Sequence, residues 1–583
     1  MSDTEKEPAE VTIEPEEQPK VEIPAENHNH PAGRFEKLKT WYLDRKKWTI
    51  PATVVLLILI LAGIPFTRYE LAGLVHHRDL DVQVLDSTAG TPVSGATVSL
   101  GSISAETSGT GVATLHNIKL GNQTLTISKK YYKSTTAKVL APIGHQKTVP
   151  SIKLVATGRQ VKISVTNLIN KKSLANVEIK IADISAKTDQ SGSAIVVLPA
   201  GSDQQNAALS LDGYNDAKVN VKVSSGKIED NQFSLTPAGK VYFLSKLSGK
   251  IDVVKTNLDG SDRQTVLAGS GKEDDQNTVL LASRDWKYLA LLSRRAGASN
   301  PSLYLINTAD DSLSTIDEGN ASFNITGWIN DDFVYTVERN DVQLWQSGRE
   351  AIKSFNAPTK KLTTLQETTA SGSGTYDYVS QQIGDVYGYD SQVYYIINWQ
   401  ASNPITTQQA TFNSVKTDGS SKKAIKSFGL ASGASAYGVS IDQQIEKPDK
   451  IHLHVWDGNQ DNFYIYSNGQ VKTDSSITTQ DFYSNDYSTY LESPSGNSTF
   501  WSESRDGKNT LFIGDGEGEN GKQIATLSDY NTYGWYTDDY LFVSKNSSEL
   551  YAMSKDAKNV IKISDYHKPS VTFRGYGGGY GGI

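Results

Sequence analysis

The sequence predicts a mainly β protein with one N-terminal transmembrane helix, two small β-sandwich domains and a C-terminal β-propeller of about seven blades. Three observations predict this fold class. One uncharged apolar stretch lies near the N-terminus, a loose repeat follows it, and the remainder consists of short alternating runs with recurring motifs. A chain of 583 residues has room for three or four domains.

The composition excludes several classes of protein. The chain has no cysteine, which excludes a disulfide scaffold, a thiol nucleophile and a Cys-ligated metal centre. A net charge of −8 makes nucleic acid an unexpected partner. For a chain outside the cytoplasm, where disulfides form readily, the absence of cysteine would also favour a bacterial source.

The first 48 residues divide into an acidic and a basic part. Residues 1–33 carry a net charge of −7 and five prolines, with no aromatic residue, so we expect a disordered cytoplasmic tail. Residues 34–48 carry a net charge of +4 and form a basic juxtamembrane segment. This segment could attract anionic lipid, but a role in setting the orientation of the chain in the membrane suffices to explain its basic residues.

A transmembrane helix is expected over 49–67. Residues 48–67 are uncharged, and twenty helical residues span about 30 Å, the thickness of a bilayer core. Two alternatives fit less well. A buried core helix would show a polar stripe, and a cleaved signal peptide normally has a short charged region before its apolar part, whereas 47 residues precede it here. The basic residues before the stretch predict a cytoplasmic N-terminus, with residues 68–583 extracytoplasmic and membrane lipid as a partner of the anchor.

Two β-sandwich domains are expected at 79–156 and 157–236. Residues 79–232 contain no Phe or Trp, and their apolar residues alternate in short runs between Gly, Ser and Asn turns. Two series of motifs recur in the same order, and Val98 and Ile179 are equivalent positions 81 residues apart.

The repeated series resembles carboxypeptidase regulatory-like domains and, more loosely, PEGA-type modules. The second copy carries the Thr188-Asp189-Gln190-Ser191-Gly192 and Gly213-Tyr214 elements of that pattern. The first copy departs from it, with Ser108 in place of the Asp and Tyr131 in place of the Gly. The resemblance implies two non-catalytic spacer or adhesive units.

A β-propeller is expected over 239–565. Gly327-Trp328 and Gly534-Trp535 each open the same Gly-Trp-x-x-Asp-Asp-aromatic element, 207 residues apart, which is typical of propeller blades. Trp328 and Trp535 should therefore occupy equivalent buried positions between blades. Six or eight blades remain open, because the fourth and fifth ranges lack clear motifs. The expected blades are 239–270, 276–318, 322–368, 375–430, 434–476, 480–529 and 532–565.

Strands and turns within these ranges follow one pattern. Residues 288–292 should form a middle strand that pairs with 302–306. Asp-Gly turns should close the outer hairpins, at Asp259-Gly260, Asp418-Gly419 and Asp506-Gly507.

The blade motifs resemble TolB-type propellers and the N-terminal propeller of the dipeptidyl peptidase IV family. In that peptidase family a serine hydrolase domain follows the propeller. Here only residues 566–583 follow, a Gly/Tyr-rich stretch expected to be flexible, and no Gly-x-Ser-x-Gly motif occurs. The catalysis of the family is therefore not expected in this chain.

Candidate metal, phosphate and stacking sites are weak. His452 and His454 share a predicted strand face without a third ligand. The Asp457-x-Asn459-x-Asp461 spacing and the acidic turn at 515–519 are better read as hairpin turns than as calcium loops. The segment 269–272 lacks the residues of a P-loop. Seven Trp residues in the propeller could stack on ligand, but core packing explains their spacing better.

The sequence thus predicts a membrane-anchored, cell-surface binding protein: a receptor, adhesin or assembly scaffold. The alternative is an extracytoplasmic enzyme with an active site on the propeller face, acting on glycan or peptide. We expect no catalytic, cofactor or metal-binding residues and no cofactor, and the sequence leaves the ligand-binding residues unknown. A protein or cell-wall glycan is the expected ligand.

Overall fold

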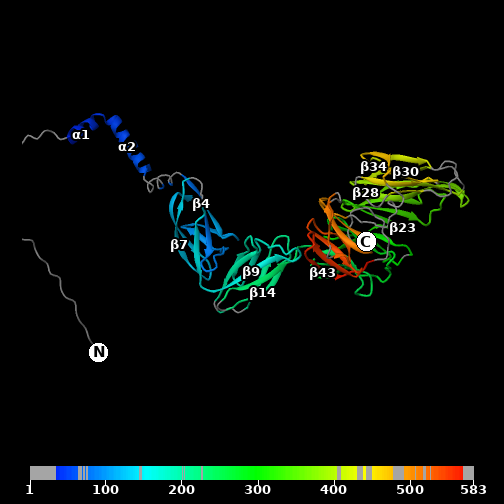
Figure 1. The fold of residues 1–583 in the computed structure, drawn as a ribbon, viewed down its shortest axis with the longest axis horizontal. Coiled ribbons are helices and arrows are strands. Elements are labelled where there is room, and N and C mark those ends of the chain that lie inside the picture. Colours follow the sequence, from blue (N-terminus) through cyan, green and yellow to red (C-terminus); the bar gives the residue numbers. More distant parts are fainter. Residues whose placement is uncertain are drawn as a thin grey trace, which may run out of the picture. The chain divides into compact units, whose positions relative to one another are not determined.

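The computed structural model shows two helices and 43 strands among the residues that it describes (Figure 1). The expected acidic tail at 1–33 lies outside them, as do 64–68 at the end of the apolar stretch and 569–583 at the C-terminus. The described residues are 34–63, 69, 73, 76–143, 148–199, 201, 204–224, 227–297, 299–402, 409–429, 438–441, 450–457, 459–476, 491–505, 507–516, 520–524 and 527–568.

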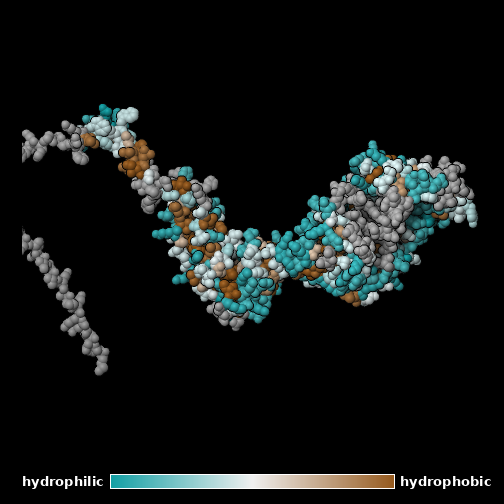
Figure 2. Space-filling model, in the orientation of Figure 1, coloured by the Kyte–Doolittle hydropathy of each residue, from teal (hydrophilic) through white to brown (hydrophobic). Residues whose placement is uncertain are grey.

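The two helices are α1 (Arg34–Asp44) and α2 (Lys46–Gly63). The hydroxyl of Tyr42 in α1 donates a hydrogen bond to Thr53 Oγ1 in α2, at 2.7 Å. Apolar residues cover α2, which stands out as a hydrophobic surface in Figure 2. Among the described helices, none combines the length and the hydropathy needed to cross a membrane.

The first β-sandwich consists of two four-stranded sheets with the orders β4-β1-β8-β6 and β3-β2-β5-β7. Alternate side chains of β1 are buried, because successive residues of a strand point to opposite faces. The strands are β1 (His77–Asp86), β2 (Thr97–Leu100), β3 (Ile103–Glu106), β4 (Val112–Lys119), β5 (Gly121–Ser128), β6 (Tyr132–Lys133), β7 (Thr135–Ala141) and β8 (Ser151–Ala156).

The second β-sandwich has the sheet orders β12-β9-β15 and β11-β10-β13-β14. Its core is aliphatic and includes Val161, Ile163, Ile179 and Leu209. The strands are β9 (Arg159–Asn167), β10 (Glu178–Ile181), β11 (Ile184–Lys187), β12 (Ser193–Leu198), β13 (Gln204–Ser210), β14 (Ala217–Lys222) and β15 (Glu229–Leu235).

Buried threonines show the repeat between the sandwiches at the level of single hydrogen bonds. Thr107 Oγ1 donates to the Val93 carbonyl at 2.6 Å, and Thr188 Oγ1 donates to the Leu174 carbonyl at 2.6 Å. Both pairs keep the offset of 81 residues read from the sequence. The two modules therefore share one local design as well as one sequence pattern.

Seven antiparallel sheets follow one another over the described part of 241–565. In each sheet the strands keep their order in the chain, as in the blades of a β-propeller. The first sheet has three strands, the fourth has five and the other five have four.

The seven sheets consist of the following strands. The first holds β16 (Val241–Ser245), β17 (Asp252–Thr256) and β18 (Gln264–Leu267), and the second β19 (Val279–Ala282), β20 (Tyr288–Ser293), β21 (Ser302–Asn307) and β22 (Ser312–Asp317). The third holds β23 (Ala321–Ile329), β24 (Asp332–Arg339), β25 (Glu350–Asn356) and β26 (Lys361–Glu367). The fourth holds β27 (Ala370–Gly374), β28 (Asp377–Tyr389), β29 (Gln392–Ala401), β30 (Gln409–Lys416) and β31 (Lys423–Gly429). The fifth holds β32 (Gly438–Ile441), β33 (Ile451–Trp456), β34 (Asp461–Ser467) and β35 (Gln470–Thr473). The sixth holds β36 (Leu491–Glu492), β37 (Ser498–Arg505), β38 (Lys508–Asp515) and β39 (Lys522–Gln523), and the seventh β40 (Tyr530–Trp535), β41 (Tyr540–Lys545), β42 (Glu549–Ser554) and β43 (Val560–Asp565).

The first and last sheets share one hydrophobic core. Phe243 of β16 and Phe542 of β41 both belong to this core. The Tyr533 hydroxyl of the seventh sheet donates to the Tyr242 carbonyl of the first at 3.0 Å. Further cores join the second sheet to the third, the third to the fourth and the fourth to the fifth.

The structure describes the predicted strand pairing and two of the three predicted Asp-Gly turns. Residues 288–292 lie in β20 and pair with β21, as predicted. Asp259-Gly260 lies between β17 and β18, and Asp418-Gly419 lies between β30 and β31, so each turn joins the last two strands of its sheet. Asp506 lies outside the described residues, so the turn expected at Asp506-Gly507 stays a prediction. An Asp-Gly pair favours any tight hairpin and does not specify which one.

Candidate functional site

The predicted histidine pair lies on β33 of the fifth sheet. His454 Nε2 lies 2.6 Å from Asp461 Oδ1, and His452 Nδ1 lies 3.3 Å from Asp474 Oδ2. Each imidazole therefore contacts a different carboxylate. Across the described residues, no three or more His, Cys, Asp or Glu side chains are grouped so that they could hold a metal ion.

The turns with ligand-like spacing are occupied by their own hydrogen bonds. Asp457 Oδ1 accepts the backbone N–H groups of Asn459 and Gln460 between β33 and β34, as expected for a hairpin turn. In the segment 269–272, the Glu273 carboxylate accepts backbone N–H groups of the same loop. The acidic turn at 515–519 lies partly outside the described residues.

The tryptophans divide into buried and partly exposed members. Trp328 and Trp535 are 2% and 0% exposed, so both are core residues, as the repeated element predicted. The Trp328 indole N–H donates to the Leu281 carbonyl of the preceding sheet at 3.0 Å. Trp286 and Trp501 are also buried, whereas Trp345, Trp399 and Trp456 are partly exposed.

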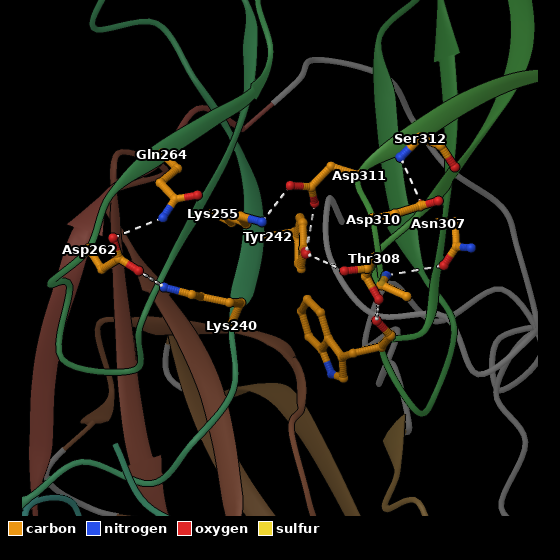
Figure 3. Close-up of polar contacts among 12 residues, drawn as sticks. Lys240, Tyr242, Lys255, Asp262, Gln264, Asn307, Thr308, Asp310, Asp311 and Ser312 are labelled. Carbon is orange, nitrogen blue, oxygen red and sulfur yellow. Dashed lines mark hydrogen bonds and ion pairs between the residues drawn. The ribbon is translucent and has the colours of Figure 1, made fainter. Parts of the chain in front are cut away.

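One polar cluster joins the first and second sheets (Figure 3). Asp311, in the turn between β21 and β22, reaches Tyr242 and Lys255, which are cross-strand neighbours in β16 and β17. The Tyr242 hydroxyl lies 3.2 Å from Asp311 Oδ1 and donates to the Thr308 carbonyl at the same distance. Burial and then the charge of Asp311 raise the pKa of Tyr242, which keeps its hydroxyl a donor.

The same arrangement recurs between the second and third sheets. Tyr335 of β24 and Lys353 of β25 are cross-strand neighbours, and both contact Asp317 Oδ2 at the end of β22. The distances are 2.8 Å for the Tyr335 hydroxyl and 2.6 Å for the Lys353 ammonium. We call these two clusters the seam clamps. Their charges and donors are satisfied within the protein, so their arrangement is suited to holding sheets together.

A second kind of polar cluster lies on the fourth sheet. Ser380 and Gln382 of β28 lie directly opposite Gln400 and Asn398 of β29, so all four side chains share one face of the strand pair. We call these four residues the amide patch. The Ile396 side chain shares this face and belongs to the core between the fourth and fifth sheets, so the patch continues that apolar core with polar side chains.

Hydrogen bonding in the amide patch is incomplete. The Gln382 side-chain amide N–H donates to Gln400 Oε1 at 2.5 Å. Ser380 is 4% exposed, yet its Oγ has no hydrogen-bond partner among the described residues, and the same holds for the buried Oδ1 of Asn398. A buried polar atom without a partner costs about 1–3 kcal/mol, so such atoms call for a ligand or an ordered water.

The sheet that carries the patch departs from the blade pattern. It has five strands, because β27 pairs with the beginning of β28, from Asp377 to Ser380, as an additional hairpin. Tyr376, in the turn of that hairpin, is 90% exposed. Additions to a repeated scaffold that present exposed aromatic and polar groups are common positions for binding sites.

Sequence reasoning missed this site, although a signal was present. Residues 362–415 contain no Lys, Arg or His, in a propeller where residues 239–565 carry a net charge of −12. The Ser, Gln and Asn residues stand out only after the strand register places them opposite one another. Their spacing in sequence matches no motif.

Comparison with known proteins gives distant structural likeness. No family model matches the chain, and no curated protein matches it. An oligogalacturonate lyase in complex with manganese has a TM-score of 0.28 at 11% identity, covering 49% of this chain and 72% of that chain. The β-propeller domain of the Trilobed protease from Pyrococcus furiosus has a TM-score of 0.29 at 14% identity, covering 49% and 83%. A putative TolB from Agrobacterium tumefaciens has a TM-score of 0.22 at 17% identity, covering 41% and 81%.

At these scores, the propeller assignment depends on the seven sheets and their shared cores. The described fold is therefore that of a mainly β protein with two sandwich modules and a propeller. The resemblance of the modules to carboxypeptidase regulatory-like domains stays a prediction from the sequence.

Proposed function

We propose that this chain is a membrane-anchored, extracytoplasmic binding protein whose propeller carries the binding surface on its fourth sheet. The amide patch carries the proposal: Ser380 and Asn398 hold buried polar atoms that the described protein leaves unpaired. The four patch side chains include no carboxylate or imidazole, so they suit binding better than acid–base catalysis.

The membrane part of the proposal is supported by α2 and the residues around it. Leu56 and Leu57 are 57% and 55% exposed, and Leu59 is 62% exposed. Apolar surface on every side of a helix is unfavourable in water and is typical of a helix in lipid. The uncharged sequence extends from α2 to Thr67, and basic residues precede it, which favours a cytoplasmic N-terminus.

Topology is tested by adding protease to intact cells that make the full chain with a tag at each end. We expect the C-terminal tag to disappear and an N-terminal fragment to remain with the membrane. Protection of the C-terminal tag in intact cells, with loss after lysis, would contradict the proposed orientation.

Binding is tested with the full chain in detergent micelles, using isolated cell-envelope material as the probe. We expect Gln382→Ala/Gln400→Ala to reduce capture of the chain. Gln264→Ala is the matched control, because Gln264 is an exposed glutamine of β18 that bonds only Asp262 among the described residues. Equal capture of the double variant and the unmodified chain would refute the patch as the binding surface.

A further inference from the structure

We infer that the amide patch recognises a neutral, hydroxyl-rich ligand, and that an uncharged oligosaccharide is the ligand class that fits it. This inference rests on the proposed function and names the ligand of the same site. It begins from the hydrogen-bonding groups that remain after the patch has paired internally.

The remaining groups include both donors and acceptors. The bond between the two glutamines uses one Gln382 N–H and one acceptor position of Gln400 Oε1. The Gln382 carbonyl, the Gln400 amide N–H groups, Ser380 Oγ and Asn398 Oδ1 have no recorded partner within the described chain. The two glutamines are partly exposed and their free groups include donors and acceptors, so sugar hydroxyls, which both donate and accept, can pair with them directly.

The strand geometry places these groups on a regular grid. Opposite residues of two antiparallel strands lie about 5 Å apart, and alternate residues of one strand lie about 7 Å apart. Ser380 and Gln400 form one row, and Gln382 and Asn398 form the next. Side chains set by sheet register keep their spacing without ligand, which lowers the entropy cost of binding.

The strands of the patch themselves disfavour an anionic ligand. No Lys, Arg or His occurs between 362 and 415, so neither β28 nor β29 nor the segment between them carries a cation that could bind a carboxylate or phosphate. The two acidic side chains closest in sequence, Asp377 and Asp385, accept hydrogen bonds within the protein, from the Ser373 hydroxyl and from the Ile441 backbone N–H. A ligand without charge suffers neither repulsion nor loss of a counter-ion here.

A peptide fits the patch less well than a sugar. Extended peptides commonly bind by adding a strand to the edge of a sheet, whereas β29 is an interior strand and β27 covers the edge of β28 from Asp377 to Ser380. The polar side chains of the patch stand out from one face of the sheet, so a ligand would contact them across that face. Tyr376, at the tip of the hairpin that leads into the patch, offers an exposed ring against which the apolar face of a sugar can pack.

The test uses the full chain in detergent micelles and a panel of defined soluble probes. The neutral probes are hexamers of glucose in α-1,4 and β-1,4 linkage and of N-acetylglucosamine; the anionic probes are polygalacturonate and dextran sulfate. We expect at least one neutral probe to bind, and Gln382→Ala/Gln400→Ala to weaken that binding by about tenfold or more while the melting temperature stays unchanged. Gln264→Ala should leave the affinity unchanged.

The outcomes separate this inference from the proposed function. Preference for an anionic probe, or equal affinity of the double variant for every neutral probe that binds, would overturn the oligosaccharide assignment. If no neutral probe binds, the envelope capture is repeated after periodate oxidation of the envelope. Loss of patch-dependent capture after oxidation would support a sugar ligand outside the panel, and its persistence would refute a sugar while keeping the binding function. Patch-independent capture, or none, would refute both.

Discussion

The seam clamps and the amide patch both hold polar side chains between neighbouring sheets of one propeller. They differ in charge and in whether the buried polar atoms have hydrogen-bond partners. At the clamps, Asp311 and Asp317 each meet a lysine and a tyrosine, and burial of these charges is compensated. At the patch the groups are uncharged, and two buried atoms lack partners. The difference suggests that polar groups near a sheet seam serve cohesion when they are paired and binding when they are left unpaired.

The largest effect should come from the core beside the clamps. Truncating Trp535, which is fully buried in the core that joins the first and last sheets, should cost about 3–5 kcal/mol in the free energy of unfolding. Trp328→Ala should behave alike in the core of the second and third sheets. Denaturant unfolding of the propeller transition measures both, with Trp345→Ala as a partly exposed control. Losses of less than about 0.5 kcal/mol would contradict a core role.

The next largest effect should come from breaking one clamp. Asp317→Ala leaves the Lys353 ammonium, only 16% exposed, without its carboxylate, and this should cost about 3 kcal/mol. Asp310→Ala is the matched control, since Asp310 is exposed and its hydrogen-bond partner among the described residues is the neighbouring Ser312 in its own turn. Equal melting temperatures for the two variants would show that the clamp contributes nothing to cohesion.

At the patch, removing a buried polar group should change the free energy of unfolding in the opposite direction. Ser380→Ala removes a buried hydroxyl that has no partner in the described chain, so stability should stay level or rise by about 1 kcal/mol. Ser283→Ala is the contrast, because Ser283 is equally buried and its Oγ bonds both Asp285 and the Tyr288 backbone N–H. That variant should lose about 1 kcal/mol. A clear loss at Ser380 would indicate a structural water or partner, and the two regions would then differ less than proposed.

The smallest effect should be one of pH. The hydrogen bond from Lys246 holds the pKa of Asp275 below 3.8, and the contact with His567 lowers it further, while partial burial acts in the opposite direction. Because the folded state lowers this pKa, the stabilisation is present above pH 3.8 and is lost as the pH falls through the folded-state value. Asp275→Asn should therefore flatten the acid limb of the propeller's stability curve. Amide groups do not titrate, so oligosaccharide affinity at the patch should not change over the pH range in which the protein stays folded.

The fold followed from the sequence wherever a local rule acts. Alternating apolar residues predicted the strands of both sandwiches, and the Gly-Trp element predicted the buried positions of Trp328 and Trp535. The fourth sheet showed no blade motif, and its additional strand β27 was not foreseen.

By itself, the sequence determined the mainly β class, the repeated design of the two sandwiches and the succession of blades, since these depend on periodicity and turn chemistry between near neighbours. Only the tertiary structure decided which polar residues meet. Ser380 and Gln400 stand twenty residues apart, and they become neighbours only through the register of β28 and β29, which shifts between Ile383 and Val386. A shift of one residue in this register would have placed the two side chains on opposite faces of the sheet, because side chains alternate along a strand. The candidate site is therefore a product of pairing and burial, which depend on contacts across the whole sheet.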